Sequence, residues 1–190
     1  MNVEQYEQMN VSPVERLHNC TTETLMQSCG DLLVGVYGTL RSGERAHSMM
    51  EGMECINTVR VVGMSMYNIG AFPAIIFTNR GNYNPAGVVI EIYRGASHDH
   101  LKRLDMYEGF PSLYHRQVFN NSVYRSGLLA LYTWGEPSSI DEEYERIESG
   151  DWVNRNNPPP HEPTDYGSLL RRAARHVRAD PVEADVRLFS

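Results

Sequence analysis

Short apolar runs, separated by turn residues, recur through the middle of this chain. They lie at residues 32–37, 56–67, 72–78, 87–93, 115–119 and 128–132, and most are rich in valine, isoleucine, leucine or methionine. Such runs between glycine, asparagine and proline predict β-strands, because branched and aromatic side chains pack well on a pleated surface. We therefore expect the middle of the chain to form a sheet.

Residues 44–53 show a different pattern, with apolar positions three or four residues apart. This spacing predicts a helix whose buried stripe consists of Ala46, Met49, Met50 and Met53. Methionine adapts well to irregular gaps, so we interpret this stripe as core filler rather than as a contact for a cofactor.

A second helix is expected after Ser97, a residue type that caps helix N-termini well. His100 stands where a capping box has glutamate or glutamine, so no full capping box is expected. Gly109 and Pro111 end the helix and place Glu108 at its C-terminal end.

The predicted elements follow the order strand, helix, three strands, helix, two strands. This order lacks the regular alternation of a doubly wound sheet. We expect an α+β fold in which a small mixed β-barrel carries flanking helices. Residues 140–147 are expected to add a short helix after the last strand.

The two ends of the chain differ from its middle. Residues 1–31 are polar with scattered apolar positions and are interpreted as a helical or loose N-terminal extension of a domain at residues 32–153. Residues 154–190 contain a proline run typical of a stiff linker, followed by an arginine-rich tail. We interpret the tail as a solvated basic face rather than as a binding helix.

Composition narrows the classes of function. The 190 residues carry a formal net charge of −7, which disfavours nucleic acid as the main partner. No apolar run approaches the ~20 residues that span a bilayer, and no secretory signal opens the chain. Cys20, Cys29 and Cys55 show no metal-binding or disulfide spacing, and the histidines form no ligand pair, so we expect a cytoplasmic protein without a metal.

The loop after the first strand is the first candidate for chemistry. The chain breaks at Gly38, and a glycine-containing loop at a strand end exposes backbone N–H groups that can hold a carboxylate or an oxyanion. The alternative is an ordinary strand-to-helix turn. The Gly38–Gly43 spacing lacks the Gly-Lys-Ser/Thr ending of a nucleotide phosphate loop, which argues against that class of site.

Glu108 is the second candidate. The helix macrodipole disfavours a carboxylate at a helix C-terminus, so the pKa of Glu108 should be raised, as a general acid or base near neutral pH requires. The alternative is a surface glutamate at a helix end.

Together these stretches resemble the γ-glutamyl cyclotransferase-like superfamily, and in style its γ-glutamylamine cyclotransferase branch. The resemblance covers about residues 32–153 and rests on five motifs in register. They are Tyr37-Gly38-Thr39-Leu40-Arg41-x-Gly43, Gly70-x-x-Pro73-Ala74, Gly87-Val88-Val89-x-Glu91-Ile92, Leu104-Asp105-x-Tyr107-Glu108-Gly109 and Tyr114-x-Arg116.

The resemblance implies a fold and a reaction. It implies a small mixed β-barrel whose loop Tyr37, Gly38, Thr39 and Leu40 binds the α-carboxylate of a γ-glutamyl group, with Tyr114 near the pocket. It further implies that Glu108 is the catalytic carboxylate and that 5-oxoproline and an amine are released without a cofactor. Arg41 and His47 would stabilise the loop, and Arg116 would form a structural ion pair.

Two alternatives stay open at this point. The same pocket could bind or sequester a small ligand without turning it over. The leaving group could belong to glutathione, to a γ-glutamyl amino acid or to γ-glutamyl-lysine, with specificity set near residues 68–72 and 110–114.

Overall fold

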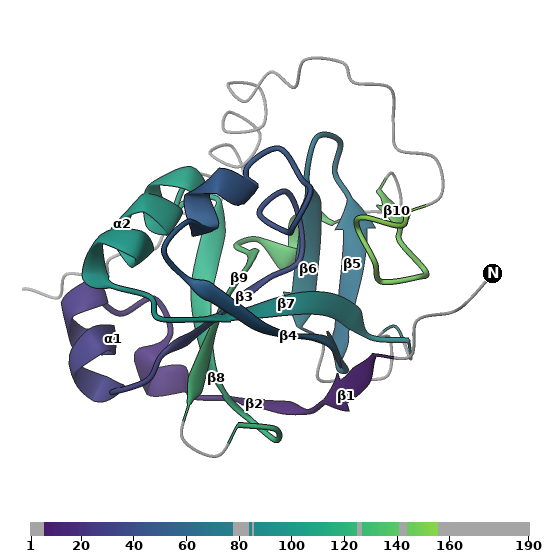
Figure 1. Ribbon diagram of the computed structural model, residues 1–190. Helices are drawn as coiled ribbons and strands as arrows, with labels where there is room; N and C mark the ends of the chain where they lie inside the picture. Colours follow the sequence, from purple (N-terminus) through teal and green to yellow (C-terminus); the bar gives the residue numbers. More distant parts are fainter. Residues whose placement is uncertain (1–5, 78–83, 85, 125–126, 141–143, 156–190) are drawn as a thin grey trace, which may run out of the picture.

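A computed structural model describes residues 6–77, 84, 86–124, 127–140 and 144–155. Its body is a seven-stranded mixed sheet with the strand order β1-β4-β7-β3-β9-β8-β2 (Figure 1). The strands are β1 (Glu7–Met9), β2 (Val11–Pro13), β3 (Leu33–Val36), β4 (Glu54–Val61), β7 (Val88–Arg94), β8 (Tyr114–Asn121) and β9 (Leu128–Trp134).

A second sheet of three strands packs against the first. It has the order β10-β5-β6 and consists of β5 (Met64–Asn68), β6 (Pro73–Phe77) and β10 (Glu145–Arg146). Two helices, α1 (Thr22–Ser28) and α2 (His98–Tyr107), lie together beside the barrel (Figure 1). The expected α+β fold, a mixed β-barrel with flanking helices, is confirmed.

The N-terminal segment joins the two edges of the large sheet. β1 pairs in parallel with β4, and β2 pairs antiparallel with β8, at opposite ends of the strand order. Only Asn10 separates β1 from β2, so one continuous segment nearly closes the barrel. Residues 7–13 are therefore strands, and the expected helical or loose conformation is wrong for them. The division at residue 31 stays a prediction.

The predicted strand at residues 56–67 is divided in two. β4 ends at Val61 and β5 begins at Met64, because the chain turns at Gly63, whose φ is +83°. β5 then pairs with β6 instead of extending the large sheet. The other predicted strands are confirmed within one or two residues at most of their ends.

The predicted helix at residues 44–53 is wrong. Only a 3₁₀ helix, η2 (His47–Met50), forms among turns, and Gly43 and Gly52 flank it with positive φ. The Ala46 N–H donates to the Thr39 carbonyl at 3.0 Å, which folds this stretch back on the preceding loop. Met50 is nevertheless buried in the core, as expected for a filler.

The predicted helix at residues 140–147 is also wrong where the structure describes it. β10 pairs antiparallel with β5, and the Ile147 N–H donates to the Met66 carbonyl at 2.8 Å. The free edge of β5 thus satisfies backbone groups that a helix would have paired internally. Residues 141–143, like the linker and tail at 156–190, lie outside the described residues.

Helix α2 begins with a capping box, contrary to expectation. Ser97 Oγ accepts from the His100 N–H at 3.2 Å, and His100 Nδ1 accepts from the Ser97 N–H at 3.0 Å. A histidine with its proton on Nε2 can therefore replace the usual glutamate. That Nε2 lies 3.1 Å from the Glu51 carbonyl, so the same ring also attaches α2 to the segment after η2.

The core has two parts because side chains alternate along the strands. Ala130 and Tyr132 of β9 belong to a cluster shared with both helices, whereas Leu129 and Leu131 belong to a cluster shared with β5 and β7. No helix in the described part of the chain is long and apolar enough to cross a bilayer.

The closing role of β1 can be tested at Met9, which is fully buried. Met9→Ala should lower the free energy of unfolding by about 2–5 kcal/mol, because it removes buried methylene groups and leaves a cavity. Urea denaturation measures this loss. Gln8→Ala is the matched control, since Gln8 is exposed on the same strand and should change stability by no more than about 0.5 kcal/mol. Equal, small effects of the two substitutions would contradict the packing of β1.

Candidate active site

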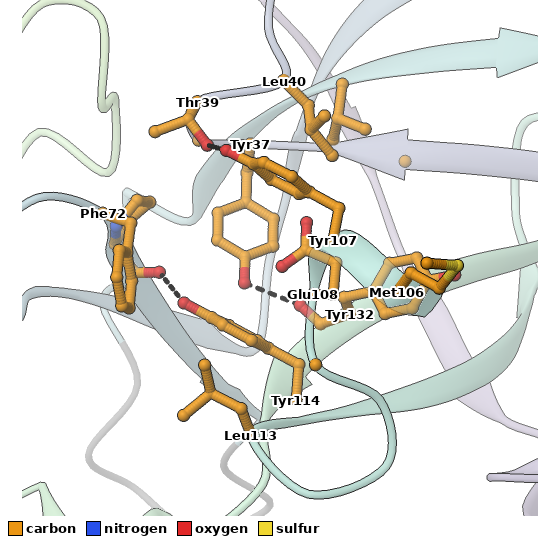
Figure 2. Close-up of a pocket in the computed structure, with 15 residues that line it drawn as sticks. Tyr37, Thr39, Leu40, Phe72, Met106, Tyr107, Glu108, Leu113, Tyr114 and Tyr132 are labelled. Carbon is orange, nitrogen blue, oxygen red and sulfur yellow. Dashed lines mark hydrogen bonds between the residues drawn. The ribbon is translucent and has the colours of Figure 1, made fainter. Parts of the chain in front are cut away.

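A cavity of about 360 Å³ opens between the end of β3, the start of β6 and the C-terminal end of α2. Its volume lies in the range of small-molecule sites. The structure brings together in its wall all six residues that the sequence singled out: Tyr37, Gly38, Thr39, Leu40, Glu108 and Tyr114. Figure 2 shows the Glu108 carboxyl directed toward the centre of the cavity, beside the Tyr37 ring.

Glycine is required where the loop leaves β3. A Cβ atom on Gly38 would lie 2.7 Å from Pro73 Cγ, closer than real Cβ contacts allow. The loop backbone therefore packs directly on the first residue of β6, which also borders the cavity. Pro73 in turn accepts a hydrogen bond at its carbonyl from the Tyr114 hydroxyl at 2.7 Å.

The loop offers unpaired backbone donors. Gly38, Thr39 and Leu40 are buried, and no acceptor in the described part of the chain pairs with their N–H groups. Buried N–H groups nearly always have a partner, so these three are suited to an anionic ligand in the cavity.

The aromatic hydroxyls around the cavity are mostly engaged with the protein. Tyr37 donates to the Tyr132 carbonyl at 2.6 Å, and burial raises the pKa of Tyr37 well above its usual value, with the nearby Glu108 adding to the shift. Tyr37 thus stays neutral. Tyr114, held by Pro73, packs edge-on against Trp134 with the ring centroids 5.4 Å apart. Both tyrosines shape the cavity with their rings.

Glu108 lies at the C-cap of α2, where its N–H donates to the Leu104 carbonyl at 2.9 Å. Burial raises the pKa of Glu108 to about 8. The sequence predicted this direction but from the helix macrodipole, whereas the walls of the cavity are the cause. Among the described residues, no ion pair or hydrogen bond engages the carboxyl group.

A hydrogen bond joins the loop to the helix. Thr39 Oγ1 and the Tyr107 hydroxyl lie 2.9 Å apart, on the two elements that carry the loop donors and Glu108 (Figure 2). Sequence reasoning quoted Tyr107 within a motif but gave it no role. It also missed Tyr132, which lines the cavity from β9. Phe72, which lines the cavity from the turn before β6, belongs to the segment 68–72 in which specificity was expected.

Arg41 anchors the loop from outside the cavity. Its Nη1 lies 2.6 Å from Asp151 Oδ1 and its Nε lies 3.3 Å from Glu91 Oε1, with all three side chains buried. The Ser42 N–H also donates to Glu91 Oε2 at 2.9 Å. His47 Nδ1 contacts the Leu40 carbonyl at 3.1 Å. The expected stabilising roles of Arg41 and His47 therefore have a structural basis.

The described residues contain no group of histidine, cysteine or acidic side chains arranged to hold a metal ion. The three cysteines are free. The chemical groups in the cavity are thus a protonatable carboxyl, backbone donors and aromatic walls.

Comparison with known proteins identifies the family of this chain. Residues 34–154 match the model of the family described as "Gamma-glutamyl cyclotransferase, AIG2-like". The chain belongs to this family, whose members act on small γ-glutamyl substrates.

The chain is similar to several individual proteins. A protein of Vibrio cholerae named "Putative gamma-glutamylcyclotransferase" is 29% identical over 124 residues, which cover 65% of this chain and 96% of that protein. A crystal structure of a uropathogenic E. coli-specific protein has a TM-score of 0.50 at 22% identity, covering 64% of this chain and 92% of that one. An uncharacterized protein from Pyrococcus horikoshii has a TM-score of 0.49 at 19% identity, covering 78% and 99%.

The raised pKa of Glu108 has a consequence for stability. Between the unfolded value near 4.5 and the folded value of about 8, the unfolded state loses a proton that the folded state keeps. The wild-type protein should therefore lose stability as the pH rises through this window, and no further above it. Glu108→Gln cannot ionise, so it should gain stability over the wild type by on the order of 4 kcal/mol between pH 5 and pH 9.

Urea denaturation of both proteins at several pH values measures this difference. Glu51→Gln serves as the control, since Glu51 is exposed at the end of η2. A stability difference between the wild type and Glu108→Gln that stays constant from pH 5 to pH 9 would refute the raised pKa.

Proposed function

We propose that this protein is a cyclotransferase that converts a γ-glutamyl compound into 5-oxoproline and a free amine. The substrate's α-amine attacks its own γ-carbonyl carbon, and a new C–N bond closes a five-membered lactam. The original amide C–N bond breaks, and the leaving nitrogen takes up a proton. Glu108 accepts the proton from the attacking amine and returns it to the leaving amine.

One observation carries this proposal. Glu108, with a pKa of about 8, shares a cavity with the N–H groups of Gly38, Thr39 and Leu40, which have no partner among the described residues. A carboxyl group with this pKa can both accept and donate a proton near neutral pH, which an ordinary glutamate does poorly. The family match supports the same type of reaction.

The loop supplies binding and orientation. The N–H groups of Gly38, Thr39 and Leu40 would hold the substrate's α-carboxylate, which fixes the neighbouring α-amine. Holding the amine against the γ-carbonyl favours an intramolecular attack that an extended, freely rotating substrate would seldom reach. The ring of Tyr114 would form the floor of this position.

The leaving amine would lie toward Phe72 and Leu113, on the side of the cavity opposite Met106 (Figure 2). These two residues fall within the segments 68–72 and 110–114 in which specificity was expected. We retain the cytoplasmic setting as a prediction from the cysteine content.

Glu108→Gln should abolish lactam formation, with a loss of about 10²–10⁴-fold in kcat, because the amide side chain cannot relay a proton. The purified protein is incubated with a panel of γ-glutamyl amines, γ-glutamyl amino acids and glutathione, and 5-oxoproline is measured by mass spectrometry. Glu51→Gln should retain full activity.

Product from the wild type alone would establish the reaction and identify the leaving group. Full turnover by a folded Glu108→Gln variant would contradict the role of Glu108. A γ-glutamyl compound that binds and is recovered unchanged would instead identify a binding module.

A further inference from the structure

A second carboxylate lies one helical turn before Glu108. Asp105 belongs to the same helix, α2, and residues three apart on a helix have Cβ atoms about 5–6 Å apart. Both oxygens of Asp105 lie 2.6 Å from Arg116 Nη1, and the Tyr132 hydroxyl donates to Oδ1 at 2.6 Å. Asp105 is thus paired by a cation from β8 and a hydroxyl from β9.

Arg116 is the cation of this pair, and its side chain is completely buried. Its Nη2 donates to the Cys20 carbonyl at 2.6 Å, and its guanidinium lies 4.8 Å from the centre of the Phe110 ring. A buried guanidinium needs a compensating negative charge. Asp105 and Glu108 are the two carboxylates of this end of α2, and Arg116 forms an ion pair with Asp105 and with no other described residue.

Four tyrosine side chains, each from a different element, line the cavity around Glu108. Tyr37 approaches from the end of β3, Tyr132 from β9 and Tyr114 from β8, and Tyr107 precedes Glu108 on its own helix. The charged groups behind this wall are Asp105 and Arg116, which lie against Tyr132 together with Glu108. Burial raises the pKa of Tyr132 well above its usual value, so its hydroxyl stays neutral.

We propose that Asp105 and Arg116 act as a positioning pair, which fixes the C-terminal turn of α2 and keeps the buried guanidinium from pairing with Glu108. The pair is neutral as a unit, so burial alone sets the proton affinity of Glu108. Its significance for catalysis rests on the proposed role of Glu108 in lactam formation.

The pair is also contacted by residues that lie outside the family match, which begins at residue 34. Thr22, on α1, donates to Asp105 Oδ2 at 3.1 Å, and the Cys20 carbonyl accepts from Arg116. Residues of the N-terminal segment therefore fix the Asp105–Arg116 pair, which in this proposal positions Glu108.

Two single substitutions should shift the pKa of Glu108 in opposite directions. Asp105→Asn leaves Arg116 without its counter-charge, so the pKa of Glu108 should fall by about one unit or more. Arg116→Gln leaves the Asp105 carboxylate unpaired beside Glu108, so the pKa should rise by about one unit or more. General loosening of the fold would admit water and lower the pKa in both variants, so the rise in Arg116→Gln distinguishes the two explanations.

The pKa is measured by NMR titration of protein carrying ¹³C-labelled glutamate side chains, with Glu108→Gln to assign the signal. The pH profile of kcat/KM should follow the pKa of Glu108. It should move to lower pH in Asp105→Asn and to higher pH in Arg116→Gln. Glu23→Gln is the matched control, because Glu23 joins α1 to α2 through half-buried His98 at 2.7 Å without touching the pair. It should leave the Glu108 titration unchanged.

Opposite shifts in the two variants support the proposal, and shifts of the same sign or no shifts overturn it. If Arg116→Gln does not fold, the double variant Asp105→Asn/Arg116→Gln is compared with Asp105→Asn. The double variant has no buried charge left in the pair, so the pKa of Glu108 should return toward the wild-type value. Equal pKa values in these two variants would overturn the proposal.

The titration is independent of turnover, so the two proposals can fail separately. Opposite NMR shifts in a protein that turns over no γ-glutamyl compound would leave the pair in place and refute the proposed function. Turnover of a γ-glutamyl compound with an unshifted Glu108 signal in both variants would support the proposed function and refute the role of the pair.

Discussion

The buried ion pairs of Arg41 are the contacts on which the site depends most. Arg41 follows directly after the loop that borders the cavity, and it joins that loop to Glu91 of β7 and to Asp151 after β10. Removing one partner from a buried pair costs about 3–5 kcal/mol, because the remaining charge is left without compensation. Arg41 thus fixes the loop to the sheet and to the last described segment, and Ser42, His47 and Thr39 add further contacts. The position of the loop therefore does not depend on the backbone N–H groups that line the cavity.

The proposed reaction requires Glu108 to exchange a proton with an amine in both directions. Burial brings the pKa of Glu108 to about 8, much closer to the pKa of an amine than that of an ordinary glutamate. In the proposed reaction this smaller difference lowers the free-energy cost of proton transfer, as a group that must first accept and then donate requires. The apolar wall of the cavity produces the shift, since it disfavours the ionised carboxylate more than the protonated one.

The sequence was sufficient to predict where the loop and Glu108 lie, because both positions depend on local residue types. Gly38 marks the end of a buried strand, and Gly109 ends the helix that carries Glu108. The cause of the raised pKa could not be predicted in the same way, because Tyr37 and Tyr132 come from strands far from Glu108 in sequence. Residues 7–13 were misassigned for a related reason. Their strands are short, show no alternation and are defined only by the partners β4 and β8. The helix expected at 140–147 does not form in the described residues of this stretch, because their backbone groups pair with the free edge of β5 instead.

The closure of the barrel by β1 and β2 also has a consequence for the order of folding. β2 is synthesised before β8, and its partners at residues 119–121 follow more than a hundred residues later. Until residues 119–121 are synthesised, the backbone groups of β2 form an open edge that can pair with other chains. The nascent protein is therefore most exposed to misassembly during this interval.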